Sequence, residues 1–290
     1  MVARTYSVVF ALLSIVTIFM STTAPSRADG KKWALLVGVE QYDSPDINRL
    51  DFAVKDVSAV ANVMAQRLGY KVRVMTSDRK DAGDVDRPTN INVFKTLDRL
   101  SEDIGPDDTF VFYFSGHGFS KDGQNFLGTV NADPASVETL ELSAIPLTIL
   151  QKKVQKLKAR QIVFIMDACR NDPEKGKGDG DNRLTNSFSK SLIVAAKSSS
   201  APNASSAILF ACSEGERAFE DPQHKQSAFT YYLLEALSGK AVKSGAITMN
   251  DVADYVQQQV TDWARDHNKK QTPELKSEGA ARLFLRGARS

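Results

Sequence analysis

The chain has 290 residues, of which 42% are apolar and 25% are charged, and its formal net charge is +2. These values exclude a disordered or fibrous chain and leave room for one sizeable hydrophobic core. Beyond the first thirty residues, the composition offers no basic stripe for nucleic acid and no second long apolar run for a membrane domain.

The first segment in chain order is predicted to be a targeting signal. A short basic start, MVAR, precedes the 13-residue apolar run VVFALLSIVTIFM, and small residues follow up to Ala28. Because this run is short for a bilayer span, residues 1–28 are expected to be a secretory signal peptide. A retained N-terminal anchor is the alternative. In either case the rest of the chain is expected to be exported, to the periplasm or the medium.

Strands and helices are predicted to alternate along the rest of the chain. Near-continuously apolar strands separated by helices indicate an α/β fold with a mostly parallel sheet covered on both faces. Apolar residues recur at three and four positions before Gly69, which is typical of an amphipathic helix that ends at a glycine. The expected strands are Trp33–Val39, Tyr70–Met75, Thr109–Ser115, 161–167, 207–213 and 281–285, and the expected helices are 51–68, 90–102, 146–157, 227–238 and 249–264, with a hairpin or loop at 124–142.

A long polar segment separates two of the predicted core strands. Residues 171–205 are rich in Gly, Ser, Asn, Asp and Lys. A segment of this length inside a compact domain is usually functional or disordered. We therefore expect residues 29–290 to form a single domain in two parts, joined by a flexible linker at 171–205.

Two apolar strands lead into residues that can carry out proton and sulfur chemistry. VFYFSGHG contains His117, and IMDACRND contains Cys169. Reactive groups gather at the carboxyl ends of parallel strands, so the two side chains are predicted to share one cleft. A thiolate is a nucleophile, and an imidazole can accept its proton. Gly118 beside the histidine leaves a backbone N–H free for an oxyanion, and the amide of Cys169 would be the second donor.

Each of these residues also has an ordinary structural interpretation. A lone histidine after a strand is commonly a loop residue, and a lone cysteine in an apolar run is commonly a small core side chain. The chain has two cysteines, so a disulfide bridge between Cys169 and Cys212 is a further alternative. Cys212 is otherwise expected in the core or a pocket wall, and His224 and His267 are expected on the surface.

The joint pattern resembles the caspase-type cysteine peptidases, and most closely a bacterial branch related to metacaspases, the orthocaspases. The caspase signature places Gln-Ala before the nucleophile and the histidine about 50 residues upstream. Here Asp167 and Ala168 precede Cys169, Asn171 stands where the signature has Gly, and the separation from His117 is 52 positions. The resemblance extends from WALLVGVEQY through LDFAVKDVSAV, ILFACSEGERAFE and SAFTYYLLEAL to the last strand.

The resemblance implies a caspase-like fold with a six-stranded sheet and a peptidase activity. His117 would be the general acid and base and Cys169 the nucleophile, without a required third member. Asp56 and Asp167 would line the pocket for the residue before the scissile bond. A buried carboxylate pair is costly unless a cation balances it, so the implied substrates are peptides or proteins with Arg or Lys at that position.

The resemblance also implies self-processing within residues 172–204, although a plain mobile loop is an equal alternative. The acids of this segment, Asp172, Glu174, Asp179 and Asp181, lack the spacing of a calcium loop, so no metal and no cofactor is expected. The second hypothesis for function is a non-catalytic caspase-like scaffold that binds peptides or proteins. Basic residues that could be cut are Lys175, Lys177, Arg183, Lys190 and Lys197.

Overall fold

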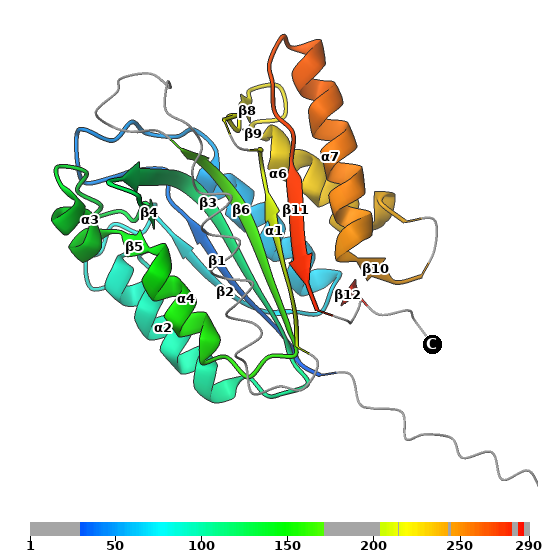
Figure 1. The fold of residues 1–290 in the computed structure, drawn as a ribbon, viewed down its shortest axis with the longest axis horizontal. Helices are drawn as coiled ribbons and strands as arrows, with labels where there is room; N and C mark the ends of the chain where they lie inside the picture. The colour runs from blue at the N-terminus through cyan, green and yellow to red at the C-terminus, as the bar shows by residue number, and fades with distance from the viewer. Residues whose placement is uncertain (1–29, 171–203, 214, 243–244, 280–283, 287–290) are drawn as a thin grey trace, which may run out of the picture.

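A central sheet with helices on both faces organises the molecule (Figure 1). The computed structural model describes residues 30–170, 204–213, 215–242, 245–279 and 284–286, with only the backbone of Cys169, Arg170 and Phe284. The expected signal peptide and residues 171–203 of the expected linker lie outside the described residues. Within them, no helix has the length and apolar character needed to cross a bilayer.

Six strands lie side by side in the order β11-β7-β6-β3-β1-β2. All neighbouring pairs are parallel except β11 and β7, which are antiparallel. The predicted α/β architecture with a mostly parallel sheet is therefore confirmed. The strands are β1 (Lys32–Gly38), β2 (Lys71–Thr76), β3 (Thr109–Lys121), β6 (Gln161–Arg170), β7 (Ser205–Phe210) and β11 (Glu274–Glu278).

Alternate residues of the central strands pack into two separate cores. Phe110, Phe112 and Phe114 of β3 face one core, whereas Val111 and Tyr113 face the other. The first core is closed by α2 (Asn90–Asp103) and α4 (Leu147–Gln155). The second is closed by α1 (Ala53–Gln66), α6 (Ala228–Glu235) and α7 (Met249–Asp266). Figure 1 shows these two groups of helices on opposite sides of the sheet.

Strand β3 is longer than the sequence pattern predicted, so the expected end at Ser115 is wrong. Residues 118–121 pair with β4 (Gln124–Leu127) in an antiparallel hairpin. The two-residue turn Asp122-Gly123 has positive φ at both positions, 48° and 76°, which suits a tight hairpin. β4 also pairs with β5 (Ile145–Pro146), and α3 (Val137–Ser143) lies between them in the chain. The hairpin continues β3 past His117.

The carboxyl-terminal part differs most from the sequence prediction. The sixth strand of the sheet is β11, whose sequence ELKSE has no apolar run because it is a partly exposed edge strand. The strand expected at 281–285 is instead the short β12 (Phe284–Arg286), which pairs with β10 (Ile247–Thr248) outside the central sheet. Ser205, expected in the linker, begins β7. A π-helical turn, η2 (Ala236–Lys240), follows α6, and the hairpin of β8 (Glu220–Asp221) and β9 (Gln226–Ser227) precedes it.

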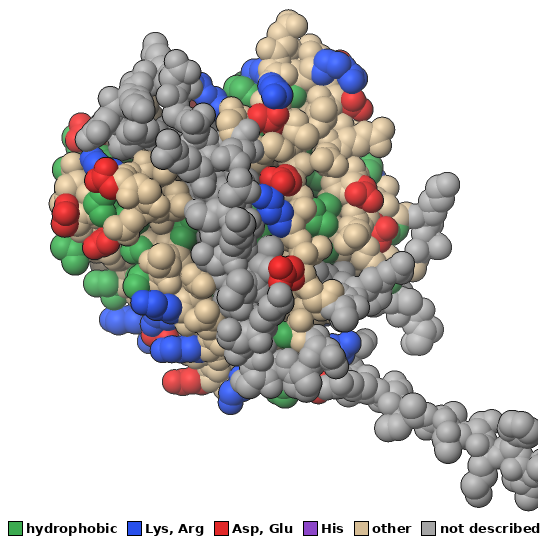
Figure 2. Space-filling model, viewed as in Figure 1, with side chains coloured by type: hydrophobic (Ala, Val, Ile, Leu, Met, Phe, Trp, Pro, Cys, Tyr) green, Lys and Arg blue, Asp and Glu red, His purple; other side chains and the backbone are tan. Residues whose placement is uncertain are grey.

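Charges of both signs are interspersed on the face of the molecule shown in Figure 2. Large apolar side chains that are more than half exposed include Val85, Ile91 and Leu142. Single exposed apolar side chains are common on protein surfaces and need no special explanation. The visible described surface therefore agrees with the near-balanced composition of the chain.

Candidate active site

The register of β3 and β6 brings the main sequence candidates together. Ser115 is paired with Asp167, and two positions further along His117 is paired with Cys169. Gly118 follows in β3, opposite Arg170 in β6 and Leu127 in β4. Residues two apart in a strand return to the same face of the sheet. The expected meeting of His117 and Cys169 therefore holds for their backbone positions.

The imidazole of His117 is held in one tautomer. The side chain is buried, and its Nε2 lies 2.7 Å from the carbonyl oxygen of Asn48. Because a carbonyl oxygen only accepts hydrogen bonds, Nε2 carries the proton and Nδ1 keeps a lone pair. Burial lowers the pKa of His117, which favours the neutral ring. The ring is thus prepared to accept a proton at Nδ1, with a main-chain carbonyl as its orienting group.

Tyr42 holds the backbone of the histidine. The main-chain N–H of His117 donates to Tyr42 Oη at 2.8 Å, and the two rings lie 5.3 Å apart. A Cβ at Gly116 would lie 3.2 Å from that hydroxyl and 2.9 Å from the Phe114 ring. The glycine before His117 therefore permits the close approach of Tyr42.

An acidic pocket lies beside the paired Ser115 and Asp167. Its walls are apolar, and its remaining lining is mostly acidic or small. The structure brings the two predicted pocket acids, Asp56 and Asp167, together here. The lining residues are Leu50, Ala53, Asp56, Ser115, Gly116, Asp167, Ala218, Phe219, Glu220 and Ser227.

Asp167 is at the end of a directed chain of hydroxyl groups. Thr230 Oγ1 donates to Asp167 Oδ2 at 2.7 Å, and Ser227 Oγ donates to the same oxygen. The Tyr113 hydroxyl lies 2.6 Å from Thr230 Oγ1 and must be the donor there, because the threonine proton is already committed to the carboxylate. Burial raises the pKa of Asp167 to about 6, and the bonds from Ser227 and Thr230 oppose that rise. The chain therefore favours the ionised form of Asp167.

Asp56 of α1 is the less stabilised of the two acids. Its Oδ2 accepts the Ser227 main-chain N–H at 3.1 Å, but its buried Oδ1 has no hydrogen-bond partner. Burial and the nearby charge of Asp167 raise the pKa of Asp56 to about 8, although the Ser227 N–H and the Gln226 side chain oppose that rise. A buried carboxylate oxygen without a donor is costly unless a ligand supplies one. The pocket therefore has an open acceptor for a cationic group.

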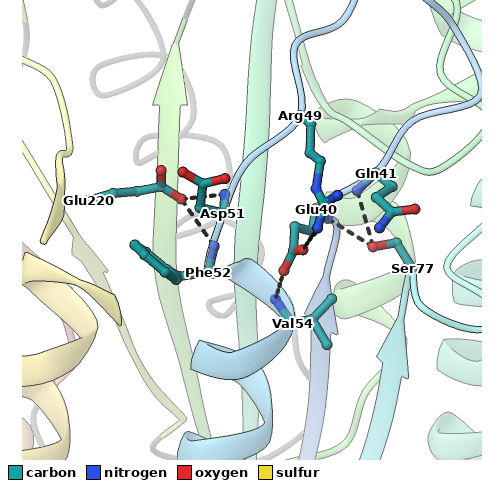
Figure 3. A network of polar contacts seen from close by, with 8 residues as sticks. All are labelled: Glu40, Gln41, Arg49, Asp51, Phe52, Val54, Ser77 and Glu220. Atoms are coloured by element: carbon teal, nitrogen blue, oxygen red, sulfur yellow. Dashed lines mark hydrogen bonds and ion pairs between the residues drawn. The ribbon is translucent and has the colours of Figure 1, made fainter. Parts of the chain in front are cut away.

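Sequence reasoning missed Glu220, which lines the pocket, and Gln271, which supports the lining residue Phe219. Glu220 of β8 lines the pocket, and its Oε1 accepts the main-chain N–H groups of Asp51 and Phe52 at 2.8 and 3.1 Å (Figure 3). Burial raises the pKa of Glu220. Gln271 is fully buried and joins the N–H of Phe219 to the carbonyl of Ala211. The only sequence signal for Glu220 is its place at the end of ILFACSEGERAFE, one of the stretches that resemble the family. Nothing in the sequence around Gln271 indicates its role.

The remaining histidines and the second cysteine lie in other settings. Cys212 is buried, and its thiol donates to the Glu216 carbonyl oxygen over 3.5 Å. His224 is partly exposed beside Asp221, with Nδ1 and Oδ2 2.6 Å apart, and His267 is exposed and stacks on Trp263. Across the described ranges, no group of three or more His, Cys, Asp or Glu side chains is arranged to hold a metal ion.

Comparisons with known proteins agree with this geometry. Residues 31–285 match a family model described as a caspase domain. Metacaspase-1 from Scheffersomyces stipitis is 35% identical over 96 residues, which is 32% of this chain and 23% of the relative. Metacaspase-1B from Aspergillus clavatus is 32% identical over 96 residues, which cover 32% of this chain and 22% of the length of the relative. The matched part thus spans less than a quarter of the length of these relatives.

Solved structures share the fold over most of the chain. Caspase-1 from Spodoptera frugiperda superimposes with a TM-score of 0.58 at 17% identity and covers 90% of this chain and 92% of its own. A structural-genomics protein from Geobacter sulfurreducens gives a TM-score of 0.57 at 16% identity, covering 87% and 94%. Together with the sheet order described above, these likenesses establish a caspase-like fold.

The two pocket acids predict an unusual dependence of stability on pH. Both carboxyls have a higher pKa in the folded chain than the ordinary value of 3.8, so their protonated forms favour folding. This contribution is complete below about pH 4 and is lost as the pH rises through about 6 and then 8. Asp56→Asn removes the larger part of this pH dependence, because Asp56 has the larger pKa shift. The variant should gain at least about 1.4 kcal/mol over wild type at pH 9, the equivalent of one pKa unit.

Urea unfolding at pH 5 and pH 9 measures this difference. At pH 5 the folded wild type keeps Asp56 protonated while the unfolded chain has begun to ionise, so the advantage of the variant should be much smaller than at pH 9. Asp46→Asn changes an exposed carboxyl and serves as the control. A variant with the same advantage at both pH values would contradict the assignment of a raised pKa to Asp56.

Proposed function

This chain belongs to the caspase family of cysteine peptidases, and we propose that it is an endopeptidase that cleaves peptide bonds after Arg or Lys. The observation that carries the proposal is the register of β3 and β6. It pairs His117 with Cys169 and places the acidic pocket at the next pair of the same face, Ser115 and Asp167. The proposed catalytic pair and the acidic pocket therefore lie at successive residue pairs on the same face of the sheet.

The proposed reaction proceeds through a thioester. The Cys169 sulfur attacks the scissile carbonyl carbon, and its proton passes to Nδ1 of His117. The main-chain N–H groups of Gly118 and Cys169 donate to the oxyanion that forms. Collapse of this intermediate breaks the C–N bond, and His117 returns the proton to the leaving amine. A water then gives a proton to His117 and attacks the thioester, which releases the carboxylic acid and restores the thiol.

The pocket supports a preference for a basic residue before the scissile bond. Leu50, Ala53 and Phe219 offer apolar contact to an aliphatic stem, and Asp56, Asp167 and Glu220 surround its end. A guanidinium or ammonium group would supply donors to the unpartnered Oδ1 of Asp56 and would offset negative charge in the pocket. An Asp side chain would bring a further negative charge into a pocket already lined by acidic groups and is expected to be excluded.

A non-catalytic peptide-binding scaffold is the second candidate function. It requires neither the neutral, oriented imidazole of His117 nor its pairing with the position of Cys169. The buried thiol of Cys212 donates to a main-chain carbonyl, which gives no support to a bridge with Cys169. The observations therefore favour the peptidase.

We also propose that the chain is exported. The support is the basic start, apolar run and small residues of the first 28 positions. These positions lie outside the described residues.

Loss of either reactive side chain is expected to abolish cleavage. Cys169→Ala removes the nucleophile and His117→Ala removes the base, so each should lower kcat for a fluorogenic Arg peptide by about 10³-fold or more. The same assay with an Asp peptide should show no activity for wild type. Wild-type cleavage after Asp alone would reverse the pocket assignment.

Thr230→Val is expected to weaken substrate binding without removing the catalytic pair. The change preserves shape but removes the hydroxyl that donates to Asp167, and a hydrogen bond to a charged group contributes ~1.5 kcal/mol or more. KM for an Arg peptide should rise about tenfold, and the acid limb of kcat/KM should move to higher pH, because Asp167 then protonates more readily.

Thr261→Val on α7 is the matched control for that variant, because the Thr261 hydroxyl is also buried but has no hydrogen-bond partner. Its KM and pH profile should equal those of wild type. An unchanged profile for Thr230→Val would show that the hydroxyl chain does not set the charge of Asp167.

We further propose that the enzyme cuts itself after a basic residue within 172–204. The support is the polar composition and the five basic residues of this segment. Mass spectrometry of purified wild type should show fragments that end at one of these residues. The Cys169→Ala variant should remain intact, and equal fragment patterns in the two proteins would refute self-processing.

A further inference from the structure

One loop makes both contacts that hold the histidine. Residues 41–52, here named the His117 loop, run from the end of β1 to the start of α1. Tyr42 of this loop accepts the main-chain N–H of His117, and Asn48 accepts the proton on its ring. The geometry of the imidazole therefore depends on how firmly the His117 loop is fixed.

Glu40 fixes the start of this loop through its carboxylate. Oε1 accepts a bond from Arg49 Nη2 at 2.8 Å, and Oε2 accepts the main-chain N–H of Val54 at 3.4 Å (Figure 3). Arg49 is the neighbour of Asn48 in the chain, and Val54 lies in the first turn of α1. The carboxylate thus joins the residue next to Asn48 to the helix that follows the loop.

The main chain of Glu40 completes the closure. Its carbonyl accepts the N–H of Leu50 at 3.0 Å, and its own N–H donates to Ser77 Oγ at 2.9 Å. Ser77 directly follows β2, so Glu40 is anchored to the sheet. The side chain of Glu40 is only 12% exposed, whereas that of Arg49 is 61% exposed. A buried acceptor therefore holds an arginine that would otherwise move freely in solvent.

Glu220 holds the far end of the same loop. Its Oε1 accepts the main-chain N–H groups of Asp51 and Phe52, which lie just before α1. Phe52 is the N-cap residue of this helix, and its side chain makes no capping hydrogen bond. Negative groups near the N-terminus of a helix are stabilised by its dipole. Unlike Glu40, Glu220 also lines the acidic pocket.

We propose that Glu40 is a positioning residue for His117, acting through Arg49 and the His117 loop. The inference rests on the proposed function, because it concerns the orientation of the base in that reaction. Glu40 does not line the pocket and does not contact the positions of the reacting atoms. Glu40 holds Arg49 and so the neighbouring carbonyl of Asn48. That carbonyl in turn orients the His117 ring, which accepts the proton of Cys169 in the proposed reaction.

Glu40→Gln tests this role with little change in shape. Both partners of the carboxylate are donors, whereas an amide offers one acceptor and one donor group, so one of the two contacts must be lost. kcat for an Arg peptide should fall about tenfold while KM stays within twofold of wild type. Glu220→Gln should instead change both constants, because Glu220 belongs to the loop and to the pocket.

A second measurement does not depend on peptide cleavage. Alkylation of Cys169 by iodoacetamide, followed by mass spectrometry across pH, reports how well the imidazole favours the thiolate. The midpoint should move to higher pH in Glu40→Gln than in wild type, with the buried Cys212 as an internal reference. Arg49→Met, which leaves the carboxylate in place, should produce a smaller shift in the same direction.

Glu235→Gln is the matched control. The Glu235 side chain is 17% exposed and contacts Lys240 and Tyr255, away from the His117 loop. Its kcat, KM and alkylation profile should equal those of wild type. If Glu40→Gln keeps the wild-type kcat and alkylation profile, the positioning role is wrong. If wild type itself cleaves no Arg or Lys peptide, the proposed function fails, and the alkylation profiles still decide the role of Glu40.

Discussion

The parallel register of β3 and β6 is the constraint on which the rest of the site depends. Because the pleat repeats every two residues, the pairs Tyr113 with Ile165, Ser115 with Asp167, and His117 with Cys169 follow one another on one face. A slip of one residue would transfer every one of these positions to the opposite face. The buried core below Ser115 fixes this register, since Phe112 and Phe164 pack together on one side and Val111 and Val163 on the other. Packing of the core thus determines which residues of the candidate site lie opposite one another.

A concentration of negative charge makes the site costly for the fold. Asp56, Asp167 and Glu220 lie around one pocket whose described lining includes no Lys or Arg. The hydroxyl chain from Tyr113 through Thr230 offsets part of this cost at Asp167, whereas Asp56 is stabilised only by the Ser227 N–H and the Gln226 side chain and keeps a raised pKa. Unbalanced polar groups at binding sites commonly lower stability in favour of ligand affinity. The three carboxyls therefore cost the fold stability at the place where the pocket forms.

The sequence predicted the sheet because its central strands are continuous apolar runs. It pointed to His117, Asp167 and Cys169 because two short motifs contain them, and to Asp56 only through the family resemblance of the stretch LDFAVKDVSAV. It did not predict β11, whose polar edge sequence carries no periodic signal. It placed the end of β3 before His117, although the Asp122-Gly123 pair that lets residues 118–121 turn into β4 is itself a local hairpin signal. The roles of Asn48, Glu220 and Gln271 arise from contacts between distant segments, through a main-chain carbonyl or a single buried side chain.

The start of α1 connects these two parts of the site. The helix has no side-chain cap of its own at Phe52, so its N-terminal region takes acceptors from Glu40 on one side and Glu220 on the other. The same two carboxylates hold the loop that orients His117, and α1 itself carries Asp56 into the pocket. Stabilisation of the helix terminus and orientation of the imidazole are thus achieved by one set of hydrogen bonds. A change that weakens the start of α1 would therefore disturb the histidine before it disturbs the core of the sheet.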